Sequence, residues 1–371
     1  MRPPDHVDHI LLEFDPASAT AGKGRALRDG LSAVERIGDS LWVANDETVS
    51  LERLTLTGKG HRAAAHVSFP LSDFLDLPVP ASPDAAQWEE ADLEGLAHAE
   101  RHLWLVGSHS LKRKLPKPGD GAAKGARQLA QLGRDGNRYL LARIPLVSDG
   151  ATWRPARCDG SRHAARLEGD ARGDILTRSL AEDPHLAPFM AIPGKDNGFD
   201  IEGLAVAADR LFLGLRGPVL RGWAIVLELD PRDESHDRLG LNPFPGEGRP
   251  YLKHFLHLDG LGVRDLCRHG DDLLILAGPT LDLDGPVRVL RWRGGAMPHK
   301  HGGLVPADRL APVLDIPYGS GVDHAEGMAL LDPGDGNTPA LLVVYDAASE
   351  QRKSGEHAVR TDVFPLPASG P

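Results

Sequence analysis

The sequence predicts an all-β fold, a β-propeller in which five blades are favoured and six blades are the alternative. The chain of 371 residues contains 42 glycines and 30 prolines, which is typical of a protein with many turns between short strands. In addition, one two-strand unit recurs along the chain, as in other repeat architectures. We expect residues 1–371 to form a single β-propeller domain, since all-β domains are often longer than about 200 residues.

The recurring unit consists of an acidic residue, a short apolar strand, a polar turn and a second apolar strand. In three copies the acid precedes a leucine of the second strand by nine residues: Glu94 and Leu103, Glu202 and Leu211, and Asp265 and Leu274. The other copies begin at Ser32 and His324, and the last one carries an insertion at residues 332–339. Such hairpins, arranged about an axis, are expected to form the inner strands of propeller blades.

Each hairpin is followed by further strand-like segments that would complete a blade. They are residues 48–56, 63–70, 137–146, 222–230, 251–259, 287–293, 311–318 and 361–366. The last blade lacks one strand, which the apolar segment 5–15 at the other end of the chain can supply. Pairing of this N-terminal strand with the last blade would close the ring and remove exposed sheet edges.

The leading acids are 59 to 63 residues apart, except between Glu94 and Glu202, where the spacing is 108. We expect a long, partly helical insertion at about residues 146–193, and the alternative is a sixth blade. This segment lacks the period-2 alternation of a strand, and residues 174–190 indicate one or two short helices around Pro184. Long loops of this kind often form lids or binding loops. Residues 112–136 are expected to form a second, mobile polar loop.

The first strand of each blade lines the central channel, so its leading residues lie at one rim. The predicted inner ring, and the predicted metal-ligand set, is Glu35, Glu94, Glu202, Asp265 and Glu326. Carboxylates ~6 Å apart repel by roughly 3 kcal/mol per pair in a medium of intermediate dielectric. Either their pKa values rise or a cation binds, and oxygen ligands favour Ca²⁺ or Mg²⁺. The alternative is that these acids cap strands or pair with arginines.

The second strand of each hairpin returns to the same rim with further polar residues. The predicted substrate-binding residues are Asp46, Ser108, His109, Arg216, Arg221 and Asp346, and a turn at residues 195–197 can face the same site. Arginines recognise carboxylates and phosphates, so a small anionic ligand beside the metal is expected. His109 is the candidate general base. The alternative is that these are solvated loop charges.

Charge and cysteine content exclude several classes of protein. The formal net charge is −11, which argues against nucleic acid as a partner because a phosphate-binding face must be basic. No 18-residue apolar run and no apolar segment of signal-peptide length are present, so no membrane association is expected. Cys158 and Cys267 are predicted to be reduced structural thiols, which is consistent with a cytoplasmic location. The histidines, among them His254, His299 and His301, show no metal-ligand spacing.

Several phrases of the chain resemble a bacterial domain family of unknown function, which is distantly similar to phytase-like and strictosidine-synthase-like propellers. The phrases are DLEGLA, SHSLKR, GKDNGFDIEGLA, LRGPVLRGWA and VVYDAAS, and the resemblance extends from about Leu31 to Tyr345. It implies a propeller with an acid-lined face, and in the better-known relatives such faces bind divalent cations and sometimes hydrolyse phosphate esters or lactones. Only Glu94, Glu202 and Glu326, which stand in E-G-[LM] phrases, match the motif.

Two functions are therefore expected above others. The first is a Ca²⁺- or Mg²⁺-dependent hydrolase of a small anionic substrate, a phosphate ester or a lactone, at the channel mouth. The second is a non-enzymatic propeller that binds a peptide or small ligand and holds a structural cation. A scaffold without any ligand at the channel is a third alternative, because propellers serve all three purposes.

Overall fold

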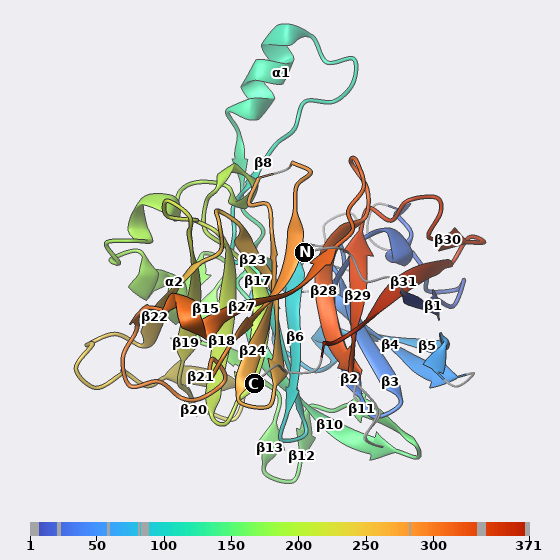
Figure 1. The fold of residues 1–371 in the computed structure, drawn as a ribbon, viewed down its shortest axis with the longest axis horizontal. Helices are drawn as coiled ribbons and strands as arrows, with labels where there is room; N and C mark the ends of the chain where they lie inside the picture. Colours follow the sequence, from blue (N-terminus) through green and yellow to red (C-terminus); the bar gives the residue numbers. More distant parts are fainter. Residues whose placement is uncertain are drawn as a thin grey trace.

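A computed structural model describes residues 7–20, 24–57, 60–80, 82, 89–281, 283–331 and 339–367. The chain is mostly β, and its strands form antiparallel meanders around a common axis, the arrangement of a β-propeller (Figure 1). Most of the insertion expected at residues 332–339 lies outside the described residues. Within the described part, no helix has the length and apolar character needed to cross a membrane.

The largest sheet joins the two ends of the chain. Its strands, in sheet order, are β2 (Leu31–Ile37), β3 (Ser40–Asn45), β4 (Ser50–Thr57), β5 (Arg62–Pro70), β1 (Asp8–Glu13), β31 (Ala358–Pro365), β29 (Ala340–Asp346) and β28 (His324–Leu331), with β30 (Lys353–Ser354) beside β31. β1 pairs with β31 in antiparallel register from Asp8↔Val363 to Glu13↔Ala358. The prediction that the N-terminal strand completes the last blade is therefore confirmed.

Three further sheets follow in chain order. The first contains β6 (Leu93–Ala99), β7 (His102–Gly107), β10 (Leu141–Asp149), β14 (Ala165–Leu167), β21 (Arg238–Leu241) and β20 (Pro231–Asp233), with β11 (Thr152–Pro155) beside β10. The second contains β17 (Asp200–Ala207), β18 (Arg210–Gly217), β19 (Trp223–Leu229), β22 (Tyr251–His257) and β26 (Gly303–Leu304). The third contains β23 (Gly262–His269), β24 (Asp272–Gly278), β25 (Val287–Trp292) and β27 (Leu310–Ile316). Every strand segment predicted after a hairpin overlaps one of these strands.

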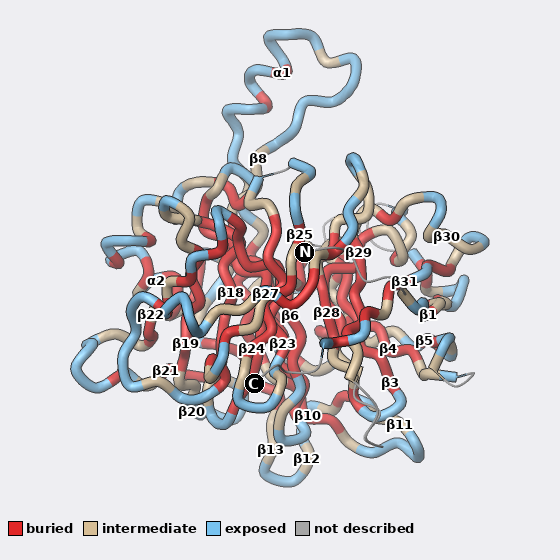
Figure 2. Tube along the Cα trace, viewed as in Figure 1, coloured by how far each residue is buried: buried red, intermediate tan, exposed pale blue. Residues whose placement is uncertain are grey.

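The first strands of the meanders surround the axis. They contact one another in a closed cycle, in the order β2, β6, β17, β23, β28 and back to β2. Each hydrophobic cluster draws its side chains from two neighbouring meanders, so the core lies between them. Figure 2 shows the central strands buried and the connecting loops exposed. This arrangement brings the start of every inner strand to one end of the channel.

The segment predicted to be a partly helical insertion, residues 146–193, contains more β-structure than expected. It holds β11, β14 and the short strands β12 (Cys158–Asp159), β13 (Arg162–His163), β15 (Gly169–Asp170) and β16 (Gly173–Asp174). Helix α2 (Ile175–Leu180) and the 3₁₀ helix η7 (Ala187–Phe189) flank Pro184. These strands are two to four residues long, too short to show an alternating pattern in the sequence.

Residues 112–136 form ordered elements where a mobile loop was predicted. β8 (Lys112–Arg113) and β9 (Leu132–Gly133) pair as a short hairpin, and α1 (Ala122–Leu129) projects from its end, away from the body of the molecule (Figure 1). Alanine, arginine and glutamine are good helix formers, which explains the helix within a segment otherwise rich in Lys, Pro and Gly. The remaining 3₁₀ helices are η2 (Leu27–Asp29), η4 (Leu71–Asp73), η6 (Gly136–Arg138), η8 (Gly194–Asp196) and η9 (Ala307–Arg309).

Candidate functional site: the channel mouth

Each inner strand has a register shift near its start that leaves one residue without a cross-strand partner. These bulged residues are Ser32, Glu94, Glu202, Arg264 and Glu326. A β-bulge redirects a side chain out of the regular pleat and is frequent next to binding sites. The ring at this end of the channel therefore consists of three glutamates, one arginine and one serine.

Two residues of the predicted ring, Glu35 and Asp265, do not belong to it. Asp265 follows the bulged residue, and its carboxylate accepts hydrogen bonds from the backbone N–H of Leu266 at 2.7 Å and of Met328 at 2.7 Å. It thus links two neighbouring inner strands. Glu35 lies three residues beyond the bulged Ser32, and it is absent from the side chains that line the channel mouth. Burial raises the pKa of Glu35 to about 8.

The glycine that follows three of the bulged residues has a packing role. A Cβ on Gly95 would lie 2.6 Å from the Cβ of Leu204, and a Cβ on Gly327 would lie 2.8 Å from the Cα of Ala33. The neighbouring inner strand therefore passes too close for a side chain. The E-G-[LM] phrase thus combines a channel-facing acid with a contact between blades.

A cavity of about 440 Å³ occupies the channel mouth. Ten acidic and five basic side chains line it: Asp46, Glu47, Glu90, Asp92, Glu94, Asp196, Asp200, Glu202, Glu326 and Asp346, with Lys112, Arg113, Arg138, Lys195 and Arg216. The predicted site residues Glu94, Glu202, Glu326, Asp46, Arg216 and Asp346 are brought together here, as is the turn at residues 195–196. The volume is in the range of small-molecule sites.

The arginines of the mouth are committed to particular carboxylates. Arg216 Nη1 lies 2.7 Å from Glu202 Oε1, and Arg138 Nη1 lies 2.7 Å from Asp92 Oδ2. Arg113 Nε lies 2.6 Å from Asp196 Oδ2. These pairs neutralise only part of the acidic lining, so the cavity keeps an excess of negative charge.

Arg264 bridges two of the bulged glutamates. Its Nε lies 3.0 Å from Glu202 Oε2, and its Nη2 donates to Glu326 Oε1. The side chain is almost fully buried. A guanidinium shared by two carboxylates is a strong, geometrically specific contact, and it fixes Glu202 and Glu326 on one side of the ring.

Glu94 has no comparable partner. Among the described residues its carboxylate makes no hydrogen bond or ion pair, and burial together with Asp92, Glu202, Glu326 and Asp46 raises its pKa well above the ordinary value. Asp46 is similar, because its Oδ1 is buried without a described hydrogen-bond donor. Burial and the charge of Asp346 raise the pKa of Asp46 well above the ordinary value. Glu94 and Asp46 thus lie beside several other carboxylates, which disfavour their ionised forms.

Two other carboxylic acids of the mouth titrate closer to neutrality. Burial, followed by the charge of Glu202, raises the pKa of Asp200 to about 7. Burial raises the pKa of Glu326 to about 8, although Arg264 acts in the opposite direction. Carboxyl groups with pKa values near neutrality can exchange protons with a bound molecule at physiological pH.

A second cavity of about 230 Å³ adjoins the first. The two share Lys195, Arg216, Glu326 and Asp346 in their walls, and the second adds Arg264, His324 and Asp284, which lies 3.4 Å from His324. Three Lys and Arg side chains thus balance the three carboxylates of this wall, whereas Glu94 and Asp46 line only the first cavity. The combined space can accept a molecule that carries both kinds of group.

His109 does not line the mouth, and the prediction that it acts as a general base is wrong. Its side chain is fully buried, with Nε2 2.8 Å from Asp174 Oδ2 and Nδ1 2.8 Å from the carbonyl oxygen of Gly107. Burial lowers the pKa of His109, but the charge and hydrogen bond of Asp174 outweigh burial and raise it. Both ring nitrogens are thus engaged, and Asp174 also caps α2. The pair fastens the segment with α2 to the loop after β7.

Ser108 and Arg221 are also displaced from the predicted position. Ser108 is buried behind the cavity wall, where its Oγ accepts a hydrogen bond from Ser110 Oγ at 3.0 Å. Arg221 is exposed in the turn between β18 and β19 and does not line either cavity. The sequence places both residues after second strands, but it does not show how the following turn directs each side chain.

Sequence reasoning missed Arg264, Arg138, Asp92 and Asp200. Arg264 could have been found by aligning the repeats on the apolar residue two positions after the bulge, which sets R-D-L beside E-G-L and E-G-M. Aligning them on the acids shifted the fourth copy by one residue and selected Asp265 instead. Asp92 and Asp200 precede their glutamates by two residues in both D-[LI]-E-G-L-A phrases, so a repeated signal was present for them.

The carboxylates of the mouth are not packed as closely as the ligands of a metal centre without water. In the part of the chain that the structure describes, three ligand-type side chains with donor atoms within 4.8 Å of one another occur at Glu228, His254 and His299. Glu228 is on β19, His254 is on β22 and His299 lies in the loop before β26, and none of them lines the mouth. A cation at the mouth would therefore keep several water molecules.

Comparisons with known proteins identify one family and several distant structural likenesses. A family model described as "Protein of unknown function (DUF3616)" matches residues 30–362. Curated proteins give no match. Among solved structures, the chain resembles Myxococcus xanthus glutaminyl cyclase with 9% identity and a TM-score of 0.39, covering 98% of this chain and 100% of that one.

Two further structural likenesses are equally distant. The PQQ-bound aldose sugar dehydrogenase from Streptomyces coelicolor is 12% identical with a TM-score of 0.37, covering 98% of this chain and 99% of that one. Kuenenia stuttgartiensis hydrazine synthase is 8% identical with a TM-score of 0.34, covering 86% of this chain. This chain spans only 57% of the length of the hydrazine synthase chain. Similarity at this level says nothing about the activity of this chain.

Proposed function

The chain belongs to this family of proteins of unknown function, and from the geometry of the channel mouth we propose that it binds a divalent cation, Ca²⁺ or Mg²⁺, together with a small anionic molecule. The observation that carries the proposal is the carboxylate of Glu94, which lines the cavity and has no positive partner among the described residues, while burial and then four neighbouring carboxylates raise its pKa. A bound cation would relieve this repulsion directly.

The donor atoms available at this place fit a hard cation. Glu94, Asp46 and Asp346 offer carboxylate oxygens, and no histidine or cysteine lines the cavity of about 440 Å³ among the described residues. Ca²⁺ and Mg²⁺ prefer oxygen ligands, and Mg²⁺ commonly keeps several water molecules. The spacing of the carboxylates suits such a hydrated ion better than a closed zinc centre.

The adjoining cavity supports the second half of the proposal. Arg216, Arg264 and Lys195 line its wall beside Glu326. An anionic group placed there would lie between these cations and a metal at Glu94, and the metal would supply charge neutralisation and polarisation of that group. A phosphate or carboxylate is therefore the expected functional group of the ligand.

Hydrolysis of a phosphate ester or lactone is the reaction that the site supports best, with binding without turnover as the alternative. The specific observation in favour of a reaction is Asp200, which lines the cavity and whose pKa, raised by burial and by Glu202, is about 7. A carboxylate with this pKa can take a proton from water at neutral pH. Asp200 therefore replaces His109 as the candidate general base.

The experiment for the cation uses the full chain after dialysis against chelator. Added Ca²⁺ or Mg²⁺ should raise Tm, since a ligand at about 100 times its Kd stabilises the folded state by about 2.7 kcal/mol. Glu94→Gln should abolish most of this shift. Glu35→Gln is the matched control, because Glu35 is also a partly buried inner-strand glutamate but does not line the mouth. Equal shifts in the wild type and Glu94→Gln would refute the proposed site.

The experiment for the reaction compares wild type and Asp200→Asn with a panel of phosphate esters and lactones in the presence of the bound cation. Turnover in the wild type that falls at least about tenfold in Asp200→Asn, with an unchanged Ca²⁺-induced Tm shift, would support hydrolysis. Binding of the panel without turnover in either protein would favour the alternative.

We also propose that the ring has five blades and that residues 1–371 form one domain. The closed cycle of five inner strands supports the count, and the pairing of β1 with β31 joins the ends of the chain in one sheet. In this description β14 is the fourth strand of the second blade, β21 and β20 extend the same sheet beyond it, and α2 packs into the core between the second and third blades.

A further inference from the structure

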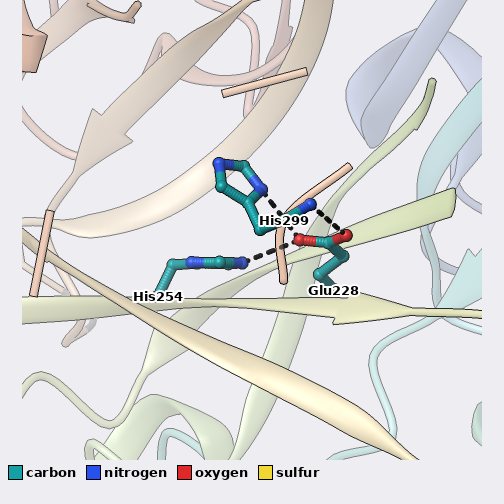
Figure 3. Close-up of side chains that lie close together, drawn as sticks. All are labelled: Glu228, His254 and His299. Carbon is teal, nitrogen blue, oxygen red and sulfur yellow. Dashed lines mark hydrogen bonds and ion pairs between the residues drawn. The ribbon is translucent and has the colours of Figure 1, made fainter. Parts of the chain in front are cut away.

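A buried polar cluster lies on the outer edge of the sheet that begins with β17. It has no role in the function proposed above. We name it the outer-edge cluster, and it consists of Glu228, His254 and His299 (Figure 3). Glu228 Oε2 lies 2.9 Å from His254 Nε2 and 2.9 Å from His299 Nδ1. The backbone N–H of His299 donates to Glu228 Oε1 at 3.1 Å.

Strand pairing explains how these distant residues meet. In the antiparallel pair of β19 and β22, His254 is opposite Val226, and Glu228 is two positions further along, so both side chains lie on one face. β26 then pairs in parallel with β22, opposite His254 and Phe255. The loop before β26 is thereby placed over this face, and it delivers His299 to Glu228.

The charges in the cluster differ from those at the mouth. Burial alone would raise the pKa of Glu228, but hydrogen bonds from His254 and His299 outweigh burial and lower it to about 2. Burial lowers the pKa of His254. The donor atoms of one carboxylate and two imidazoles lie within 4.8 Å of one another here, and these are side chains that bind transition metals.

The side chain of Arg210 does not compete with the two histidines for Glu228 Oε2. Arg210 Nε lies 4.0 Å from Glu228 Oε1, and Arg210 Nη1 pairs with Asp230 at 2.6 Å. Oε2, which points toward the two imidazoles, has no ion pair with Arg210. The ring of His299 stacks on Trp292 with 5.3 Å between centroids, and this contact orients the imidazole.

We propose that the outer-edge cluster binds a transition metal ion, Zn²⁺ above others, through Glu228 Oε2, His254 Nε2 and His299 Nδ1. Two histidines and one carboxylate form a donor set that Zn²⁺ accepts in sites with an open fourth position. Zinc lies about 2.0–2.2 Å from such atoms, so donor atoms now 2.9 Å apart need to separate by only a few tenths of an ångström. Each imidazole would bind the metal through the nitrogen that faces Oε2 and would carry its proton on the other ring nitrogen.

The fourth position has space available. A cavity of about 380 Å³ has His254 and His299 in its wall, together with Trp292, Arg293, Met297 and Arg309. The open position of the metal would face this cavity and bind water or one small ligand. The two arginines favour a ligand that carries negative charge.

The sequence did not reveal this site, because its members are 26 and 45 residues apart. Sequence analysis found no metal-ligand spacing among the histidines. His299 lies in a glycine-containing loop, where a solvated side chain is the usual reading, yet its side chain is only 25% exposed. Only the pairing of β26 with β22 makes the three side chains neighbours.

The test measures metal binding to the untagged full chain after removal of metal with chelator. Titration with Co²⁺ should give one equivalent with the intense visible absorption of a tetrahedral site, and Zn²⁺ should displace it. His299→Ala should weaken binding by at least about tenfold and remove the absorption band. His301→Ala is the matched control, because His301 is 76% exposed in the same loop and is not part of the cluster, and it should bind as the wild type does.

A second pair of variants separates this site from the channel mouth. Glu94→Gln should keep the Co²⁺ band, and His299→Ala should keep the Ca²⁺-induced Tm shift. His254→Gln, checked by circular dichroism for an unchanged fold, should lose the band as His299→Ala does. If wild type, His299→Ala and His254→Gln bind Co²⁺ with equal affinity, or if the wild type takes up none, the cluster is a hydrogen-bonded network and the proposal is wrong.

Discussion

The channel and the outer-edge cluster are both buried and charged, but they are organised in opposite ways. In the channel, carboxylates face carboxylates, and burial together with neighbouring acids raises the pKa of Glu94 and Asp46. In the outer-edge cluster, one carboxylate faces two imidazoles, and their hydrogen bonds outweigh burial and lower the pKa of Glu228 to about 2. In the first arrangement Glu94 has no basic partner among the described residues, whereas the second has its donors in place.

The origin of each region explains this difference. The channel is built from copies of one strand, so equivalent positions bring like charges to the axis wherever the copies agree. The outer-edge cluster is built from three unrelated segments that meet once, so its residues can differ and complement one another. Arg264 shows the same principle inside the ring, because the copy that departs from the acidic pattern supplies the charge that Glu202 and Glu326 need.

The largest effect is expected for Arg264→Met. Removal of the shared guanidinium leaves Glu326 without its basic partner and Glu202 with Arg216 alone, and breaking a buried pair typically costs about 3–5 kcal/mol of unfolding free energy. The loss should be larger at about pH 8 than at about pH 5. Burial raises the pKa of Glu326 to about 8, so at about pH 5 this side chain is protonated and carries no charge that needs a partner. Urea denaturation at both pH values measures it.

Arg268→Met is the control for this change, since Arg268 lies on the same strand with an exposed side chain. It should alter stability by no more than about 0.5 kcal/mol. An Arg264→Met protein as stable as the control at both pH values would contradict the role given to the ring.

A smaller effect, which changes over a lower pH range, is expected for Glu228→Gln in metal-free protein. Gln offers one acceptor oxygen where the carboxylate satisfies two imidazoles and a backbone N–H, so the loss at neutral pH should be about 1–3 kcal/mol. Because the pKa of Glu228 is lowered from 4.5 to about 2, its contribution is full above about pH 4.5 and disappears as the pH falls through about 2.

The difference between wild type and Glu228→Gln, followed by guanidinium denaturation across this acidic range, measures the contribution. A pH-independent difference would mean that the carboxylate is not the group that titrates, and that the substitution acts through packing instead.

The fold and part of the mouth could be predicted from the sequence because both follow from the repeat. Strand positions, the pairing of β1 with β31 and the convergence of Glu94, Glu202 and Glu326 all depend on periodic apolar patterns and equivalent offsets. A bulge shifts the register by one residue without a sequence mark of its own. This shift is the reason that Asp265 was predicted in place of Arg264.

The rest depended on contacts that no local pattern encodes. The orientation of His109 is determined by Asp174, which is 65 residues away, and the position of His299 depends on a two-residue strand, β26. Such contacts are made once, between segments without a common period. Repeats in the sequence therefore predict the residues around the channel axis, but not the contacts made once between distant segments.

The smallest effect is expected for Glu35→Gln, inside the channel. Burial raises the pKa of Glu35 from 4.5 to about 8, so the folded state holds a proton that the unfolded state releases between these values. Stability of the wild type should therefore decrease as the pH rises from about 4.5 to about 8, opposite to the behaviour at Glu228. Gln cannot ionise, so the variant avoids the cost of burying a charge at high pH. It also buries an amide that needs hydrogen-bond partners, which lowers stability, and the two effects partly offset each other. The variant should thus match the wild type at about pH 5 and exceed its stability by about 1 kcal/mol at about pH 9. A variant that is less stable than the wild type at about pH 9 would contradict the expected cost of ionising Glu35 in the channel.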